Sequence, residues 1–541
     1  MPGMIVAPQP QAVEEGAKAL MAGGNAIDAA VICAFVQSVV SPQMCGIGGY
    51  CLLNLHLARS ESSGKSPQGI MLDAPALAGS LATPTMWRGI VIGPNPDGWG
   101  YFLQGKVNDL GYQSVCTPGA VKGLAAVLAR WGTISWEAAL APAARIAQEG
   151  FVVDEHLANG WKAKAGHAEA CSLLDYIRGN QEASRIYLHP DGTPYEAGET
   201  LHNPDYARTL GQLAERGAED FYHGKLAQRM VDDLTAGGSL MTREDLANYR
   251  LRQVQPVVGP YRGYTVSTSP APHGGPTLLA ILNILEGYDL AALGHNTPEY
   301  IYRVSMAMKA AFADRNPYLG DPEFVDVPLP WMTSKTRAAE WRQHIDAGTP
   351  ISVSFTPSEP PDTTHVSVVD RWGNCVALTH SLGSSSGVIT PGLGFMYNNS
   401  MVNFHPFPGH ANSIAPGKGR TTGMSPTIVY KGDRPVLVLG APGATRIITS
   451  VAQVILNVLD FRMSVSEAVL APRFDCEGEL IKCQARIPEY VCAEVRKKHP
   501  ITRLPVSHGG LALVHAIQID PKAGQLVGAA DTGAGGMALL V

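Results

Sequence analysis

The sequence predicts an α+β fold in which helices and strands occur in blocks. Residues 118–250 contain Ala-rich segments that are typical of helices, whereas short β-branched runs separated by Gly, Pro and Asn turns follow Thr363. No strict alternation of one strand with one helix runs along the chain, so a doubly wound parallel sheet is disfavoured. The 541 residues fit two to four domains or one unusually large layered fold.

The first third alternates helices with short strands. An amphipathic helix is predicted over 11–21, and Asn25 is expected to cap a buried helix over 26–40. That apolar run contains polar residues and is too short to cross a membrane. A glycine turn over 45–50 then leads into a strand over 51–55. This order, helix before turn and strand after it, is the reverse of a dinucleotide-binding loop.

The remaining elements follow from the same periodicities. Helices are predicted over 119–130 and 136–149, with loops at 179–183 and 189–198, and a helix pair is expected between 277 and 314. After Thr363 the sequence predicts strands over 364–369, 374–380, 425–430 and 435–439, followed by helices over 447–459 and 464–470.

Composition excludes several classes of function. Charged residues make up 16% and the net charge is −6, without a basic stripe, so no nucleic-acid partner is expected. Nine scattered cysteines without a Cys-x-x-Cys pair suit a reducing compartment. The amino terminus shows no secretory signal, and we expect a cytoplasmic location without membrane contact. Sixteen histidines lack metal-ligand spacing, and no metal or other cofactor is predicted.

Thr363 is a candidate nucleophile. It follows a Ser/Pro-rich stretch, 352–361, which is also the only weak linker in the chain. Cleavage before Thr363 would create an amino-terminal threonine whose own α-amine, with a reference pKa of about 7.7 to 8.0, serves as the base for its hydroxyl. The same run alternates like an ordinary half-buried strand, and that interpretation stays open on this segment alone.

Two further segments fit around Thr363. A hairpin through the turn 370–373 would bring the hydroxyl of Ser381, at the end of the predicted strand 374–380, close to Thr363. The small-residue turn 440–446 joins a predicted strand to a helix, and its N–H groups can face a developing negative charge. Such an oxyanion hole is worth about 2.7 to 4 kcal/mol per donor. A plain strand-to-helix connection is the alternative for this turn.

An ordered set of motifs carries a family resemblance. These are Gly-Gly-Asn-Ala-Ile-Asp-Ala-Ala at 23–30, Gly-Ile-Gly-Gly at 46–49, Thr-Pro-Gly at 117–119, Ala-Asp-Arg at 313–315 with Leu-Gly-Asp-Pro at 319–322, Thr-Thr-His-Val-Ser-Val-Val-Asp at 363–370 and Met-Ser-Pro-Thr-Ile at 424–428. Through nearly its whole length the chain resembles the gamma-glutamyl transpeptidase family of N-terminal nucleophile hydrolases.

This resemblance implies a fold, a cut and a mechanism. The implied fold is a four-layer αββα sandwich, in which a large segment 1–362 and a small segment 363–541 are interleaved after self-cleavage between Asp362 and Thr363. The implied mechanism has Thr363 attack an amide carbonyl while the N–H groups of Gly443 and Ala444 hold the oxyanion. Ser381 takes the place of a supporting threonine. Water or an amine acceptor then removes the acyl group, which makes the enzyme a hydrolase, a transferase or both.

The positions that hold the γ-glutamyl group in this family carry other residues here. They are Met71-Leu72-Asp73-Ala74-Pro75 without the family's arginine, Gly383 for an asparagine, Ser400 for a glutamine, Asn403 for an acidic residue and Thr422-Gly423 for a serine pair. Loss of the arginine and the carboxylate removes two charge-assisted contacts, each worth roughly 1.5 to 3 kcal/mol. Arg446 either supplies a replacement positive charge or is a solvated residue at a helix start.

The sequence therefore predicts a self-processing threonine amidohydrolase or acyltransferase that acts on a small-molecule amide with a different acyl group. A genuine γ-glutamyl (glutathione) hydrolase or transpeptidase is one alternative, and an unprocessed, inactive binding protein is another. Two chains from one precursor are expected, and a homo-oligomer is left open.

Overall fold

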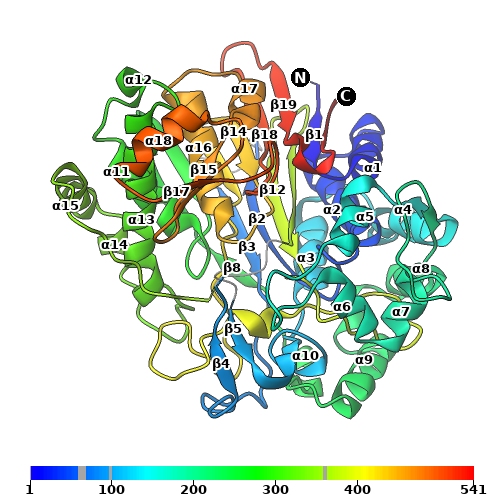
Figure 1. Cartoon of the computed structure of the whole chain (residues 1–541). Helices are drawn as coiled ribbons and strands as arrows, with labels where there is room; N and C mark the ends of the chain where they lie inside the picture. Colours follow the sequence, from blue (N-terminus) through cyan, green and yellow to red (C-terminus); the bar gives the residue numbers. More distant parts are fainter. Residues whose placement is uncertain (1, 59–68, 97–99, 358–361) are drawn as a thin grey trace.

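Two antiparallel sheets lie face to face at the centre of the computed structural model, which describes residues 2–58, 69–96, 100–357 and 362–541 (Figure 1). The first sheet has the order β20-β1-β11-β12-β2-β3-β8, with bounds Met537–Leu540, Met4–Ala7, Thr364–Val369, Cys375–Ser381, Tyr50–His56, Ile70–Ala74 and Arg252–Val254. The second has the order β19-β18-β14-β13-β10-β9, with bounds Leu526–Ala530, His515–Ile519, Arg434–Gly440, Thr427–Lys431, Tyr264–Thr268 and Val257–Tyr261.

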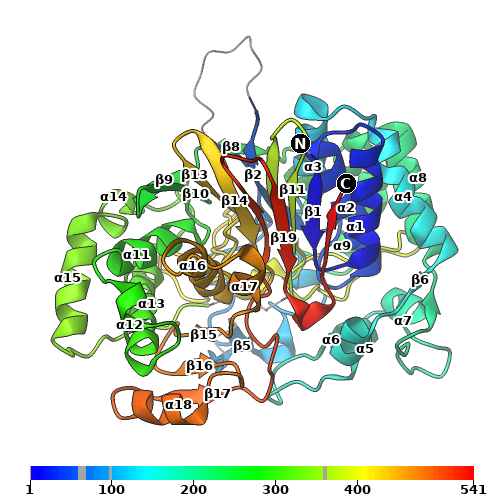
Figure 2. The same cartoon turned by 90° about the horizontal axis from the view of Figure 1, so that it is seen from above.

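Helices cover the outer face of each sheet (Figures 1 and 2). The first group comprises α1 Pro10–Met21, α2 Ala26–Val40, α3 Ala120–Trp131, α4 Trp136–Glu149, α5 Glu155–Lys162, α6 Leu173–Arg178, α7 Gln181–Tyr187, α8 Pro204–Arg216, α9 Lys225–Ala236 and α10 Arg243–Ala247. The second comprises α11 Gly275–Leu285, α12 Leu290–Leu293, α13 Pro298–Tyr318, α14 Leu329–Met332, α15 Lys335–Asp346, α16 Arg446–Leu459, α17 Val465–Leu470 and α18 Glu489–Arg496.

Short strands lie outside the two central sheets. They are β4 Val91–Pro94 with β5 Tyr101–Leu103, β6 Phe151–Val152 with β7 Thr200–Leu201, and β15 Phe474–Asp475, β16 Ile481–Cys483 and β17 Ile501–Arg503. Among the described residues, no helix is both long and apolar enough to cross a bilayer.

Three apolar cores hold the four layers together. One lies between the first sheet and its helices, and another lies between the second sheet and its own helices. A third fills the space between the sheets and includes Val6, Ala377, Ile428, Val438 and Ile517. Because alternate strand residues face opposite sides, each sheet buries one face against helices and the other against its partner sheet. The predicted four-layer αββα sandwich is confirmed.

Local sequence signals located most elements correctly. Asn25 caps α2 through a capping box with Asp28, and the predicted buried helix and the helix over 136–149 have the expected bounds. The hairpin is also confirmed, because β11 and β12 pair through the turn that starts at Asp370, with Thr364 opposite His380.

The predicted loop over 179–183 is wrong in part. Helix α7 begins at Gln181, because Asn180 accepts a hydrogen bond from the N–H of Ala183 and so caps the helix. Strands β1 and β20 were not predicted; each has four residues, and they pair with each other from opposite ends of the chain (Figure 2). Residues 358–361 of the predicted linker lie outside the described part.

Candidate active site

Thr363 lies directly before β11 and is 4% exposed. Its Oγ1 is 2.8 Å from the carbonyl oxygen of Asp362 and 3.1 Å from Oγ of Ser381. The Ser381 hydroxyl donates to the same Asp362 carbonyl oxygen at 2.8 Å and accepts the N–H of Gly383 at 2.9 Å. The predicted approach of the two hydroxyls is confirmed, and both lie against the carbonyl of the residue that precedes Thr363.

The pairing of three strands fixes this arrangement. Ser381 ends β12, which pairs with β11 on one side and with β2 on the other, where Tyr50 is its partner. Backbone hydrogen bonds on both sides therefore set the position of the Ser381 hydroxyl relative to Thr363.

The turn after Ser381 depends on a glycine. Gly383 has φ +76°, and a Cβ at this position would lie 2.2 Å from Oδ1 of Asn399. That oxygen accepts the N–H of Ser384 at 3.0 Å. An asparagine, which the family has here, does not fit without movement of Asn399.

We expect Gly383→Ala to slow chain splitting strongly, because the left-handed conformation costs a non-glycine residue about 1 to 2 kcal/mol and the new methyl group displaces Asn399. A time course of splitting on denaturing gels measures the effect. Gly392→Ala is a matched control, since Gly392 also has a positive φ but its Cβ meets only the guanidinium of Arg229, at 3.1 Å. Equal rates for the two variants would contradict the expectation.

The carboxyl group of Asp362 is held by a second hydroxyl of the same turn. Oγ of Ser384 donates to Oδ2 of Asp362 at 2.5 Å. Burial raises the pKa of Asp362 to about 6, while the Ser384 hydrogen bond and the positive charge of Arg446 lower it and the charge of Asp109 raises it further. Above pH 6 the folded chain therefore carries a poorly solvated carboxylate.

This shift predicts a pH-dependent change in stability. Because the folded pKa of Asp362 exceeds the ordinary 3.8, the ionised group destabilises the uncut chain, by an upper limit of roughly 3 kcal/mol, at pH values above about 6. In an uncut Thr363→Ala chain, adding Asp362→Asn should raise Tm at pH 8 and leave it nearly unchanged at pH 3, where the Asp362 carboxyl group is mostly neutral in both the folded and the unfolded chain. Calorimetry tests this, and an equal gain at both pH values would contradict it.

The predicted oxyanion turn lies at the end of β14. Gly443 and Ala444 are buried with φ +134° and +60°, and among the described residues neither N–H group donates a hydrogen bond to the protein. A Cβ on Gly440, just before this turn, would lie 2.2 Å from the ring of His365, which belongs to β11. The turn therefore lies beside the strand that Thr363 precedes, with two N–H groups available.

Gly423 and Thr422 pack inside the protein. A Cβ on Gly423 would lie 2.1 Å from the carbonyl oxygen of Ala444, so this position supports the turn by close backbone approach. The Thr422 hydroxyl accepts the N–H of Met424 at 3.1 Å and lies 2.8 Å from Nδ1 of His273. Its hydrogen-bonding capacity is thus used within the chain.

The other predicted binding residues differ in whether their side chains have a hydrogen-bond partner in the protein. Ser400 and Asn403 lie on a buried turn, Ser400–Asn403, and their side-chain polar atoms have no hydrogen-bond partner among the described residues. Arg446 begins α16 and donates to the carbonyl oxygen of Gly510 at 2.8 Å. Met71, in place of the family's arginine, is fully buried in an apolar cluster.

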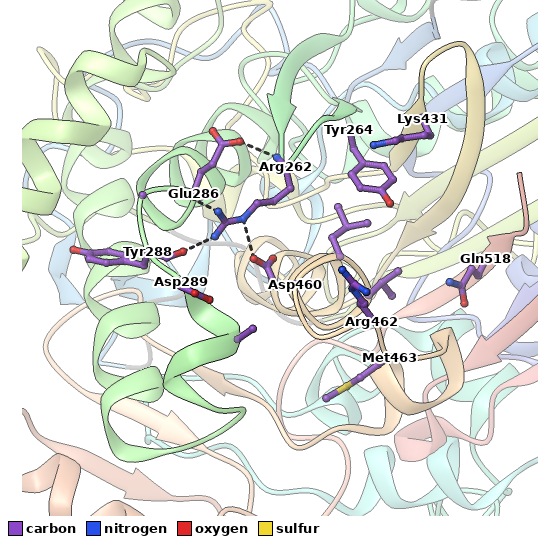
Figure 3. Close-up of a pocket in the computed structure, with 14 residues that line it drawn as sticks. Arg262, Tyr264, Glu286, Tyr288, Asp289, Lys431, Asp460, Arg462, Met463 and Gln518 are labelled. Atoms are coloured by element: carbon purple, nitrogen blue, oxygen red, sulfur yellow. Dashed lines mark hydrogen bonds and ion pairs between the residues drawn. The ribbon is translucent and has the colours of Figure 1, made fainter.

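An open cavity of about 870 Å³ lies on the second sheet and its helices, and Thr363 is not among its lining residues (Figure 3). Its Arg262 donates to Asp460 at 2.9 Å and to the backbone carbonyl groups of Glu286 and Tyr288. None of the predicted site residues lines this cavity, so we do not assign the reaction to it.

Several residues next to Asp362 were not predicted. Ser384, Asn399, Asp109 and Tyr176 come from three separate parts of the chain. Only Ser384 carried a signal, as a hydroxyl three positions after Ser381; the others are brought in by tertiary contacts.

Comparison with known proteins shows the family and the fold of this chain. The sequence pattern of the gamma-glutamyltranspeptidase family matches residues 12–541. The chain is 38% identical over 536 residues to the acylase ACY 1 proenzyme of Pseudomonas sp. strain V22, covering 98% of this chain and 91% of that protein. It is 34% identical over 491 residues to the glutathione hydrolase proenzyme of Escherichia coli K12, covering 87% and 80%. The cephalosporin acylase of Bacillus halodurans has a similar structure, with TM-score 0.85, 27% identity and coverage of 99% and 95%.

The fold and these relatives define an enzyme of the N-terminal nucleophile hydrolase class. Within this class the chain belongs to the gamma-glutamyltranspeptidase family, and it is acylase-like, with hydrolase and transferase relatives.

Proposed function

We propose that this chain cuts itself between Asp362 and Thr363 and then cleaves amides through an acyl group carried on Thr363. The observation that carries the proposal is the position of the Thr363 hydroxyl, 2.8 Å from the Asp362 carbonyl oxygen, which Ser381 also contacts. The products would be chains of 362 and 179 residues.

The self-cleavage is an acyl shift followed by hydrolysis. A bond forms between Thr363 Oγ1 and the Asp362 carbonyl carbon while the carbon–nitrogen bond breaks, and the proton of the hydroxyl passes to the nitrogen, which becomes the α-amine. Water then hydrolyses the ester and restores the hydroxyl. Ser381 donates to the carbonyl oxygen at 2.8 Å in the uncut chain, where it stabilises the developing negative charge.

In the mature enzyme the same atoms act on an external amide. The freed α-amine takes the proton of the Thr363 hydroxyl and gives it to the leaving amine. The N–H groups of Gly443 and Ala444 are the proposed donors to the oxyanion. Water or an amine acceptor then removes the acyl group.

The acyl group is proposed to differ from γ-glutamyl. Met71 is buried among apolar side chains, so this position offers no cation to a substrate carboxylate. Thr422 bonds within the chain and Gly423 packs on the backbone, which removes the hydroxyl pair expected of the family. Separately from the substrate, we propose that the protein is located in the cytoplasm.

Splitting and substrate range test the proposal together. A folded sample should give two bands on a denaturing gel, with Thr363 as the new amino terminus by mass spectrometry, and should hydrolyse simple N-acyl 4-nitroanilides faster than the γ-glutamyl compound. Faster γ-glutamyl turnover favours the glutathione-type alternative. One persistent band without turnover favours the binding protein.

A further inference from the structure

A cavity of about 300 Å³ adjoins the proposed cleavage site. Asp362 and Ser384 form part of its wall, and Phe102, Leu103, Leu173 and Val402 supply an apolar surface. The side chain attached to the scissile carbonyl therefore faces a partly open space that is large enough to hold a short acyl chain.

One turn of the chain contacts both polar ends of Asp362. Ser381 donates to its carbonyl oxygen at 2.8 Å, and Ser384 donates to its carboxyl oxygen at 2.5 Å. Three covalent bonds separate the two carbonyl-type carbons of an aspartyl residue. The two serine hydroxyls of this turn are therefore placed to bind a carbonyl oxygen and a second hydrogen-bond acceptor on a carbon that lies three bonds away from the carbonyl carbon.

Ser384 is held firmly by a buried chain of hydrogen bonds. Its N–H donates to Oδ1 of Asn399, whose Nδ2 donates to Asp109 at 2.8 Å. The hydroxyl of Tyr176 donates to the same oxygen of Asp109 at 2.8 Å. Because the Asp109 carboxylate can only accept hydrogen bonds, the Asn399 amide must turn its Nδ2 toward Asp109. Its Oδ1 then faces the N–H of Ser384 and holds that residue in place.

Self-cleavage and substrate turnover place a carbonyl carbon against the same Thr363 hydroxyl. The acyl substituent of a substrate then has the direction that Asp362 takes in the uncut chain, and this direction leads into the cavity. Once Asp362 is released by hydrolysis, the hydroxyl of Ser384 loses its acceptor and can donate to another.

We propose that this cavity is the acyl pocket of the mature enzyme and that Ser384 determines its specificity. The preferred acyl group carries a hydrogen-bond-accepting oxygen on the carbon three bonds from the amide carbonyl carbon, as in 4-oxopentanoyl amides. This inference rests on the proposed function of Thr363 and adds the substrate class to it.

An uncharged acceptor suits the cavity better than a carboxylate near neutral pH. Burial opposes ionisation of the Asp362 carboxyl group there more strongly than the Ser384 hydrogen bond and the positive charge of Arg446 favour it, and Asp109 adds a negative charge nearby. A ketone oxygen accepts the Ser384 hydrogen bond without this cost.

The test compares 4-nitroanilides of 4-oxopentanoic acid, pentanoic acid and 5-oxohexanoic acid on fully split protein. In turnover, Thr363 Oγ1 bonds to the acyl carbon, the bond to nitroaniline breaks, and the hydroxyl proton reaches the nitroaniline nitrogen through the α-amine; water then releases the acid. The wild type should show at least a tenfold higher kcat/KM for the 4-oxo compound than for either of the other two.

Ser384→Ala should bring the 4-oxopentanoyl to pentanoyl ratio close to one, whereas Ser386→Ala, whose hydroxyl bonds to Tyr397, should keep the wild-type ratio. Equal rates in the wild type, or an unchanged ratio in Ser384→Ala, would overturn the inference. If Ser384→Ala does not split, the wild-type series alone decides. Acetylation of Thr363 by 4-nitrophenyl acetate, read by mass spectrometry, separates the two proposals: acetylation without a ketone preference overturns only the pocket assignment.

Discussion

A Thr363→Ala chain should remain a single polypeptide of 541 residues and should lack amidase activity. Removing the hydroxyl removes both the nucleophile that reaches the Asp362 carbonyl and the acyl acceptor of the later reaction. The expected effect is complete loss of splitting and of turnover, measured by denaturing electrophoresis and by release of nitroaniline.

Thr363→Ser is the matched control, because it keeps the hydroxyl and loses only a methyl group. It should still split and turn over substrate. Splitting of Thr363→Ala at the same bond would show that another group attacks Asp362, and the mechanism proposed above would then fail.

Ser381→Ala should slow splitting by roughly 100- to 1000-fold, the effect typical of losing one donor to a developing oxyanion. In the uncut chain Ser381 donates to the Asp362 carbonyl oxygen and lies 3.1 Å from the Thr363 hydroxyl, so one substitution removes both contacts. A gel time course from freshly refolded protein measures the rate.

Ser381→Thr provides the comparison, since the hydroxyl is retained and the family has threonine at this place. It should split at close to the wild-type rate. If Ser381→Ala splits as fast as wild type, the carbonyl oxygen must be stabilised by other donors during the reaction, and the role given to Ser381 would be withdrawn.

The sequence located the parts of the fold that local signals determine. The cap at Asn25 and the hairpin that starts at Asp370 depend on neighbouring residues, and both were predicted correctly. Strands β1 and β20 have four residues each, too few for a clear period, and they are stabilised by pairing across the whole length of the chain. No short window of sequence contains that information.

The residues of the site are likewise of two kinds: some could be predicted from nearby sequence and others could not. Ser381 was predicted because a hairpin fixes its distance from Thr363, whereas Asp109 and Tyr176 reach the Asp362 environment only through packing of distant segments. Gly423, which stands where the family has a serine that binds substrate, has a structural role in this chain. Gly423 proved to be required by the backbone of Ala444, which a comparison of side-chain chemistry does not reveal.

The order of strands in the first sheet has a consequence for the cut protein. If the chain breaks before Thr363, strand β1 of the larger product remains between β20 and β11 of the smaller one, and β12 remains paired with β2. In the second sheet, β10 of the larger product also pairs with β13 of the smaller one, so dissociation of the products requires four rows of backbone hydrogen bonds to open. The break would remove one covalent bond, but the new amino terminus would stay at the start of β11, which pairs with β1 on one side and β12 on the other, so strand pairing would keep Thr363 in place after its link to Asp362 is lost.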